Sequence, residues 1–234
     1  MTPIYELRDV TKTYGQGSTQ VAAVSNVSLS IDSGEFVAIA GPSGSGKTTL
    51  LQLLGGLDRP TSGDVMFEER NLAKLREAEL TRLRLSTIGF VFQQFNLIPT
   101  VSAADNVGLA LAPRGLKVAE RRERVEELLG AVGLGSRGHH LPSQLSGGEQ
   151  QRVAIARSLA NEPRVVLADE PTGNLDSTTG DEIVAILRRL SDDRGQTIVL
   201  ITHDERIAAV ADRTIHMQDG RVLAGTTTRS LEVA

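Results

Sequence analysis

The stretch EFVAIAGPSGSGKTTLLQLLGGL, residues 35–57, joins an apolar run to a glycine-rich loop and then to a leucine-rich run. The first six residues include β-branched ones and predict a buried strand, and the leucine-rich run predicts a helix that ends at Gly55-Gly56. The loop between them, GPSGSGKT, matches the pattern G-x-x-x-x-G-K-[ST] in full. A strand, this loop and a helix in that order predict a phosphate-binding loop.

The residue types in this loop suit a nucleotide. Glycines let backbone N–H groups surround phosphates, Lys47 reaches the β- and γ-phosphates, and the hydroxyl of Thr48 ligates Mg²⁺. The alternative is a Gly-Ser turn that happens to precede a lysine, but the flanking strand and helix favour nucleotide binding. The residues expected at the phosphates are Gly41, Pro42, Ser43, Gly44, Ser45, Gly46, Lys47, Thr48 and Thr49.

A second motif, which ends in two acidic residues, follows much later, in VVLADE at residues 165–170. Asp169 ends an apolar run typical of a buried strand and can complete the Mg²⁺ shell, and Glu170 can act as the general base for an attacking water. The alternative is a solvated strand end. A phosphate loop with an acidic strand end occurs in kinases, GTPases and helicases, so these two motifs do not choose a class.

A second anion-binding pattern lies in LSGGEQQRVAIARSL, residues 145–159. Ser146, Gly147 and Gly148 directly precede a long amphipathic run, and the first amides of a helix have no partners inside it and carry the positive end of its dipole. One chain thus carries two separate phosphate-binding patterns.

This stretch resembles the signature sequence of ATP-binding cassette (ABC) ATPases, and the resemblance covers essentially the whole chain in the family's motif order. It implies ATP and Mg²⁺ as cofactors, with Lys47 and Glu170 in catalysis. It also implies a homodimer in the ATP-bound state. In that family two domains pack head to tail, and each signature closes over ATP held by the other's phosphate loop.

Four further residues take roles from the resemblance. It implies that Tyr14 stacks on adenine, that Gln93 touches Mg²⁺ and the water, that Asp176 reaches across the dimer, and that His203 contacts the γ-phosphate. Tyr14 could instead be a packed edge-strand residue, and Gln94 is the alternative to Gln93. The neighbouring His139 and His140 fit a solvated turn better than a metal site.

The expected fold is α/β, a P-loop NTPase core with a mixed sheet, an N-terminal antiparallel β subdomain and an inserted helical subdomain. We predict a single ABC ATPase domain over 1–234, with residues 1–70 and 147–234 as the nucleotide-binding core and 71–146 as a mostly helical lobe. Two apolar stripes support the lobe. They are Leu72, Leu75, Leu80 and Leu83, and Val125, Leu128, Leu129 and Val132.

The charge, cysteine content and hydropathy of the chain exclude or disfavour several classes of function. The 234 residues have a net charge of −4 and scattered Lys and Arg, which disfavours nucleic acid as a partner. The absence of cysteine excludes thiolate metal sites and disulfides. No apolar run approaches the roughly 20 residues of a membrane span. We expect a cytoplasmic protein, held on the inner face of the cell membrane by a permease.

The partner is expected from the resemblance. Phe95, Leu97 and Ile98, with Pro99 and Val101, resemble the family's docking surface for a permease, although they could be ordinary lobe core. IGFVFQQFNLIPTVSAADNV and ADEPTGNLD resemble the branch that serves macrolide and peptide exporters, lipoprotein release and cell division, with a separately encoded permease. A mechanotransmitting regulator, an importer subunit and a soluble non-transport ABC ATPase remain as alternatives.

Overall fold

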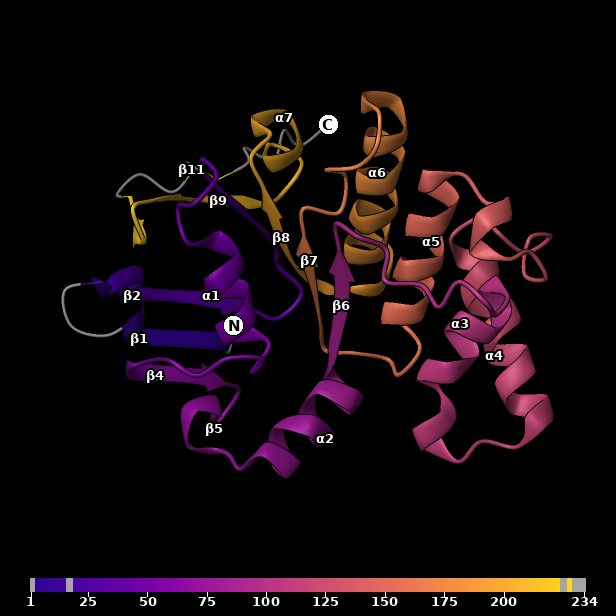
Figure 1. Cartoon of the computed structure of the whole chain (residues 1–234), viewed down its shortest axis with the longest axis horizontal. Helices are drawn as coiled ribbons and strands as arrows, with labels where there is room; N and C mark the ends of the chain where they lie inside the picture. The colour runs from indigo at the N-terminus through magenta and orange to yellow at the C-terminus, as the bar shows by residue number, and fades with distance from the viewer. Residues whose placement is uncertain (1–2, 16–18, 224–226, 229–234) are drawn as a thin grey trace.

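A computed structural model describes residues 3–15, 19–223 and 227–228 of the chain. An antiparallel sheet occupies one side, a central sheet the middle, and a group of helices the other side (Figure 1). The antiparallel sheet has the order β2-β1-β4-β5. Its strands are β1 (Pro3–Tyr14), β2 (Val21–Asp32), β4 (Ser62–Phe67) and β5 (Arg70–Asn71).

A bulge in β1 explains its apolar spacing. Tyr5 and Leu7 are two apart, but Val10 follows three residues later, and all three are buried. Asp9 has a φ of +50°, and the pairing with β2 shifts register between Leu7 and Val10. The extra residue returns Val10 to the buried face.

The central sheet has seven strands and is mixed. Strands β3, β8, β7 and β6 are parallel neighbours, β9 is parallel to β3, and β10 and β11 pair antiparallel with β9. Asp219 and Gly220, both with positive φ, form the turn between β9 and β10. The bounds are β3 (Phe36–Ala40), β6 (Ile88–Phe92), β7 (Val165–Asp169), β8 (Thr197–Thr202), β9 (Arg213–Gln218), β10 (Arg221–Val222) and β11 (Thr227–Thr228).

The two faces of the central sheet pack against different helices. Side chains alternate along a strand, so Val37 and Ile39 face one cluster and Phe36 and Ala38 the other. The first cluster contains the leucines of α1 (Lys47–Leu54) and the inner face of the antiparallel sheet. The second contains α5 (Gly147–Ser158) and α6 (Ser177–Arg194). The sheet therefore separates α1 from α5.

The remaining helices extend the second cluster. Val125, Leu128 and Leu129 are buried on one face of α4, as their spacing predicts, and Val132, the C-cap of α4, is buried with them. The helix α3 packs on both α4 and α5. Figure 1 shows α3, α4 and α5 together at the side of the molecule away from the antiparallel sheet. The bounds are α3 (Ala103–Ala110), α4 (Val118–Ala131) and α7 (Glu205–Ala208).

The segment 71–146 departs from a purely inserted lobe. Its strand β6 lies in the central sheet beside β7, so part of this segment belongs to the core. The first leucine stripe is split between a 3-10 turn at Leu72–Lys74 and α2 (Glu77–Thr87), and it packs with α1 and the antiparallel sheet. The helices that form a separate layer begin at Ala103.

Parallel strands gather the predicted motifs. The strands β3, β8, β7 and β6 are neighbours, so their carboxyl ends lie along one edge of the sheet. The phosphate loop follows β3, His203 follows β8, Asp169 ends β7 and Gln93 follows β6. We call this the carboxyl edge.

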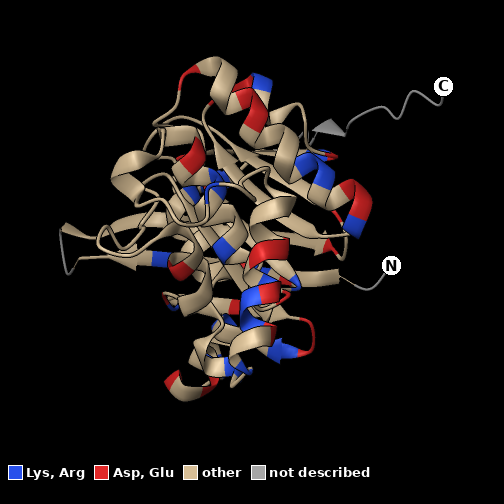
Figure 2. Ribbon diagram, turned by 90° about the vertical axis from the view of Figure 1, so that its right-hand side faces the viewer, with Lys and Arg blue, Asp and Glu red and all other residues tan. Residues whose placement is uncertain are grey.

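The surface carries charges of both signs. Figure 2 shows Lys and Arg interspersed with Asp and Glu along the helices of the displayed side. On α4, for example, Arg122 pairs with Glu126 and Arg124 with Glu127. Among the described residues, no helix has the length and apolar character needed to cross a bilayer.

Candidate active site

The phosphate loop depends on Gly46 for its shape. Gly46 has a φ of +98°, and a Cβ here would lie 2.0 Å from the carbonyl oxygen of Ala23 on β2. Only glycine fits, because L-residues disfavour this φ and the contact is with backbone. α1 begins at the next residue, so its unpaired first amides face the loop. This is the arrangement of an anion site at a helix N-terminus.

Lys47 is folded back onto the loop. Its side chain is 5% exposed, and Nζ donates to the carbonyl oxygens of Gly41 and Pro42 at 2.7 and 2.8 Å. The hydroxyl of Ser45 is buried and has no protein partner among the described residues. A buried ammonium and a free hydroxyl thus lie where the sequence predicts phosphates, and both groups can donate to a phosphate oxygen.

Thr48 and Asp169 meet at the carboxyl edge. The Thr48 hydroxyl donates to Oδ1 of Asp169 at 3.2 Å. Burial raises the pKa of Asp169, and so does the neighbouring Glu170, whereas Thr48 and Lys47 lower it. Hydroxyl and carboxylate oxygens are the hard donors that Mg²⁺ prefers, and Mg²⁺ at nucleotides uses few protein ligands. This pair fits a magnesium ion shared with nucleotide phosphates.

Glu170 and His203 form a second pair at this edge. Nδ1 of His203 lies 2.9 Å from Oε2 of Glu170, with the histidine side chain 58% exposed and the glutamate 20% exposed. Glu170 has a φ of +44°, which is costly for a non-glycine residue, and its N–H donates to the carbonyl of Ile201 at 3.1 Å. The strained backbone and the histidine fix the carboxylate beside the Mg²⁺ pair.

Gln93 contacts the loop that follows Glu170. Its Nε2 donates to Oδ1 of Asn174 at 3.1 Å, and Nδ2 of Asn174 donates back to the Gln93 carbonyl at 3.0 Å. Gly173 permits this approach, since a Cβ there would lie 2.7 Å from Nε2 of Gln93. Gln93, the residue directly after β6, therefore links the end of β6 to the loop that follows β7.

The signature residues begin α5 at an exposed surface. Ser146 is the N-cap: its hydroxyl accepts from the N–H of Glu149 at 3.2 Å, and the Glu149 carboxylate accepts from the N–H of Ser146 at 2.8 Å. Gly148 is buried, and a Cβ there would lie 2.3 Å from Cγ2 of Thr179 on α6. Gly148 is thus required for helix packing as well as for any role at a phosphate.

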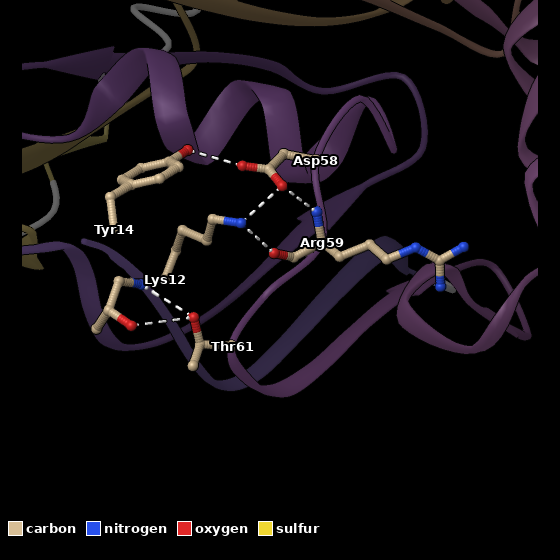
Figure 3. Close-up of polar contacts among 6 residues, drawn as sticks. Lys12, Tyr14, Asp58, Arg59 and Thr61 are labelled. Carbon is tan, nitrogen blue, oxygen red and sulfur yellow. Dashed lines mark hydrogen bonds and ion pairs between the residues drawn. The ribbon is translucent and has the colours of Figure 1, made fainter. Parts of the chain in front are cut away.

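Tyr14 ends β1 and is 42% exposed, so it is not a packed core residue. Its hydroxyl donates to Asp58 at 2.7 Å, and the Lys12 ammonium lies 4.9 Å from the ring centre and 2.6 Å from the same carboxylate (Figure 3). Burial raises the pKa of Tyr14, and Asp58 adds to this, whereas Thr49 of the phosphate loop lowers it. The ring is held beside α1.

Asp176, His139 and His140 are the remaining residues that the sequence singled out. Asp176 is the N-cap of α6 and accepts from the N–H and hydroxyl of Thr179, which lowers its pKa. The ring centres of His139 and His140 lie 4.3 Å apart, and the rings are tilted by 48° to one another. Across the described ranges, no three His, Cys, Asp or Glu side chains gather as a metal site.

The segment after Gln93 is fixed to the signature helix. Arg157 near the end of α5 donates to the carbonyls of Phe95 and Asn96 at 2.9 and 2.5 Å. Burial lowers the pKa of this guanidinium. Leu97 packs against the second cluster, whereas Ile98 is 45% exposed. Of the proposed docking residues, Ile98 is thus on the surface and Leu97 is partly in the core.

Comparison with known proteins identifies the family. Residues 24–173 match the family described as ABC transporter. The chain belongs to this family. It is an ATP-binding cassette that binds and hydrolyses ATP with Mg²⁺, and the expected P-loop fold with its mixed sheet and antiparallel subdomain is confirmed.

The cassette is similar to two kinds of relative. A macrolide export ATP-binding/permease protein, MacB, of Hyphomonas neptunium is 51% identical over 222 residues, 95% of this chain and 34% of the relative. The chain thus spans about a third of that protein. An uncharacterized ABC transporter ATP-binding protein, MJ0796, of Methanocaldococcus jannaschii is 49% identical over 221 residues, 93% of this chain and 94% of the relative.

A solved structure matches the whole cassette. The dimeric post-hydrolysis state of the MJ0796 cassette, bound to ADP and Pi, superposes with a TM-score of 0.87 at 46% identity, covering 96% of this chain and 98% of that one.

Sequence reasoning missed several supporting residues. Asn174 and Gly173 hold Gln93, and Lys12 and Asp58 hold Tyr14. Asp58 and Asn174 lie far in sequence from Tyr14 and Gln93, so no local pattern gives these contacts, whereas Lys12 is only two residues from Tyr14. Gln151 carried a usable signal, because it is a polar residue three positions after Gly148 and four before Ile155, on the buried face of α5.

Proposed function

We propose that this cassette drives a membrane permease of the export, lipoprotein-release or mechanotransmission type by hydrolysing ATP in a head-to-tail homodimer. The alignment of 95% of the chain with one third of a macrolide export ATP-binding/permease protein carries this proposal. In that relative the name gives both functions to one protein, whereas the MJ0796 relative has the length of a cassette. We propose a permease on a separate chain.

The dimer arrangement is supported by the position of the signature. Ser146 is exposed at the start of α5, and the central sheet separates α5 from α1 and its phosphate loop. A second copy can bring its own Ser146, Gly147 and Gly148 to this loop. Asp176 lines the same pocket as Glu170 and His203, which supports a contact between Asp176 and the partner copy.

The chemical step follows from the groups at the carboxyl edge. The loop amides and Lys47 bind the β- and γ-phosphates, after Lys47 exchanges the carbonyls of Gly41 and Pro42 for phosphate oxygens. Thr48 and Asp169, with Gln93 nearby, would hold Mg²⁺, and the bound ion would supply positive charge to the phosphates. Glu170 takes a proton from water as the water oxygen bonds to the γ-phosphorus and the bond to the bridging oxygen of ADP breaks. His203 holds Glu170 and faces the γ-phosphate.

The permease contact is proposed on the helical side. Phe95, Leu97 and Ile98 follow Gln93 directly, and Arg157 links their backbone to the signature helix. Beside them, α3 and α4 enclose a groove that includes Val101, Leu109 and Val118, the last two exposed. Through this contact the cassette would lie on the inner face of the cell membrane.

The active site is tested with Glu170→Gln. We expect at least a hundredfold loss of kcat with ATP binding retained, because a positioned general base is removed without a change of shape. Hydrolysis by phosphate release and ATP binding by equilibrium dialysis give the two values. Hydrolysis at the wild-type rate would contradict the assignment of Glu170.

The partner is tested by capture. Tagged Glu170→Gln protein is recovered from detergent-solubilised native membranes with and without ATP, and the proteins that accompany it are identified. A permease supports the proposal, and its external domain indicates the cargo. Recovery of the ATP-dependent homodimer alone, with the permease detectable in the same extract, would favour a soluble ABC ATPase.

A further inference from the structure

Gln151 is a buried polar residue in the signature helix. Its side chain is 0% exposed, and it lies on the face of α5 that packs on β6 and α6. Glutamine is seldom fully buried, and a buried amide is retained at a cost unless its hydrogen bonds are made. The residue therefore requires an explanation beyond filling the core.

The amide group of Gln151 bridges two separate segments. Nε2 donates to the carbonyl oxygen of Pro171 at 2.7 Å and to that of Phe92 at 3.3 Å. Both neighbours are acceptors, so the NH₂ group and not the carbonyl must face them. The other end of the amide, Oε1, is buried without a protein partner in the described residues. A leucine or methionine would avoid that unpaired oxygen but would lose the bridge.

The two carbonyls lie at the active-site ends of adjacent strands. Phe92 ends β6 and precedes Gln93, while Pro171 follows Glu170, and Phe92 is paired in register with Asp169. Glu170 has the strained φ of +44°, so its orientation depends on contacts that hold the chain on either side. Gln151 supplies one such contact directly after it.

We infer that Gln151 is a positioning residue that couples the signature helix to the catalytic base of its own chain. When ATP of the partner copy contacts Ser146 at the start of α5, the bridge from Gln151 transmits the position of that helix to the backbone around Glu170 and Gln93. Each copy then orients its own base more accurately when its signature is engaged, and a copy whose signature is not engaged keeps a lower rate. This inference rests on the proposed roles of Glu170 and of the head-to-tail dimer.

Loss of the bridge from Gln151 should change the kinetic constants in a specific way. Gln151 does not touch the phosphate loop, so its loss should leave ATP binding unchanged and lower the rate of the chemical step. A merely structural role would instead lower the melting temperature without separating kcat from KM. Small displacements of a catalytic group reduce the rate strongly, so a fall of about tenfold to a hundredfold in kcat is expected.

The experiment compares Gln151→Met with Gln196→Met in the full chain. Methionine keeps the length of glutamine and removes the donors. Gln196 is a matched control, since its Nε2 donates to the carbonyl of Pro163 at 3.1 Å, at the opposite ends of β7 and β8. Melting temperature, kcat, KM and ATP binding are measured for both, with Glu170→Gln alongside.

The expected result is a fall in kcat for Gln151→Met with KM within about threefold of wild type, and wild-type kinetics for Gln196→Met. Wild-type kcat in folded Gln151→Met would overturn the inference. If the methionine variant does not fold, Gln151→Asn decides, because its amide is one methylene too short to keep both contacts. Failure of both to fold would assign Gln151 to stability and overturn the positioning role. Normal hydrolysis by Glu170→Gln would refute the proposed base, independently of Gln151.

Discussion

Individual side chains at the carboxyl edge make hydrogen bonds to other groups of the protein. Some of these protein partners would be replaced by a bound nucleotide, and others would stay beside it. Lys47 contacts loop carbonyls, Thr48 contacts Asp169, and Gln93 contacts Asn174. Lys47 and Thr48 use the atoms that the proposed mechanism assigns to phosphate and Mg²⁺, whereas Gln93 bonds Asn174 through Nε2 and leaves Oε1, its possible Mg²⁺ ligand atom, out of this bond. For Lys47 the cost of reorganisation is small, since its ammonium exchanges carbonyl oxygens for phosphate oxygens.

Tyr14 gives a prediction at the residue scale. Its exposed ring is held by Asp58 and Lys12 beside the phosphate loop, which suits stacking on a base. Tyr14→Ala should weaken ATP binding about tenfold to a hundredfold, since base–aromatic stacking contributes about 1–3 kcal/mol. Tyr14→Phe, which keeps the ring, should bind nearly as wild type. Inorganic triphosphate is the control ligand, and its binding should be the same for all three proteins. Equal ATP binding by Tyr14→Ala would refute stacking.

Four of the proposed site residues could be predicted from the sequence because each occurs in a short local pattern. GPSGSGKT gives Lys47 and Thr48, and VVLADE gives Asp169 and Glu170. The family resemblance was needed for Tyr14 and His203, which have no such pattern. The supporting contacts of Asn174 and Gln151 depend on which strands become neighbours, and a single sequence does not give that order.

At the scale of elements, most strands and helices follow from periodicity. The strand β6 lies within the segment that was predicted as a mostly helical lobe, and its place in the central sheet was not foreseen. An apolar run predicts a strand without naming its partner, and the parallel partner β7 begins more than seventy residues later. Because the flanking segments are helical, the strand was assigned to the predicted lobe.

Tyr5 gives a prediction at this scale, since it joins β1 to the end of α1. Its buried hydroxyl donates to the Leu54 carbonyl at 2.9 Å. Tyr5→Phe leaves that carbonyl unpaired and should lower the free energy of unfolding by about 1–2 kcal/mol at pH 7, measured by urea denaturation.

The pH dependence of this difference follows from ionisation. Burial raises the pKa of Tyr5 in the folded protein, while in the unfolded chain it ionises near its ordinary value of about 10. The contribution of the Tyr5 hydroxyl to the free energy of unfolding is thus fully present below pH of about 10. It is lost as the pH rises toward the pKa that Tyr5 has in the folded protein. The difference between wild type and Tyr5→Phe should shrink above that pH. A constant difference up to pH 11 would refute this coupling.

The whole molecule presents two half-sites on one chain. The phosphate loop and the signature lie on helices that pack on opposite faces of the central sheet, so in the proposed head-to-tail dimer a second copy completes each site. In that dimer ATP would form part of the interface, and its hydrolysis would remove that part. Opening and closing of the dimer is the motion that we propose to drive a permease.

Ser146 allows this arrangement to be tested without loss of the helix. Asp and Asn are as good at an N-cap as Ser, so Ser146→Asp and Ser146→Asn both keep α5, but only the carboxylate repels a phosphate. In a Glu170→Gln background, ATP should dimerise the Asn variant like the parent. The Asp variant should dimerise at least about tenfold more weakly, as measured by size exclusion with light scattering. Equal melting temperatures are the control for folding.

Mixing of inactive chains distinguishes a shared site from two separate ones. With Glu170 intact, Lys47→Ala removes the phosphate loop's cation and Ser146→Asp blocks the signature, so neither homodimer should hydrolyse ATP. A mixed dimer pairs the intact loop of one chain with the intact signature of the other and restores one site of two. Phosphate release should therefore appear on mixing and reach a maximum near equal amounts. No activity at any ratio, with mixed dimers detected, would show that Ser146 and Lys47 act within one chain.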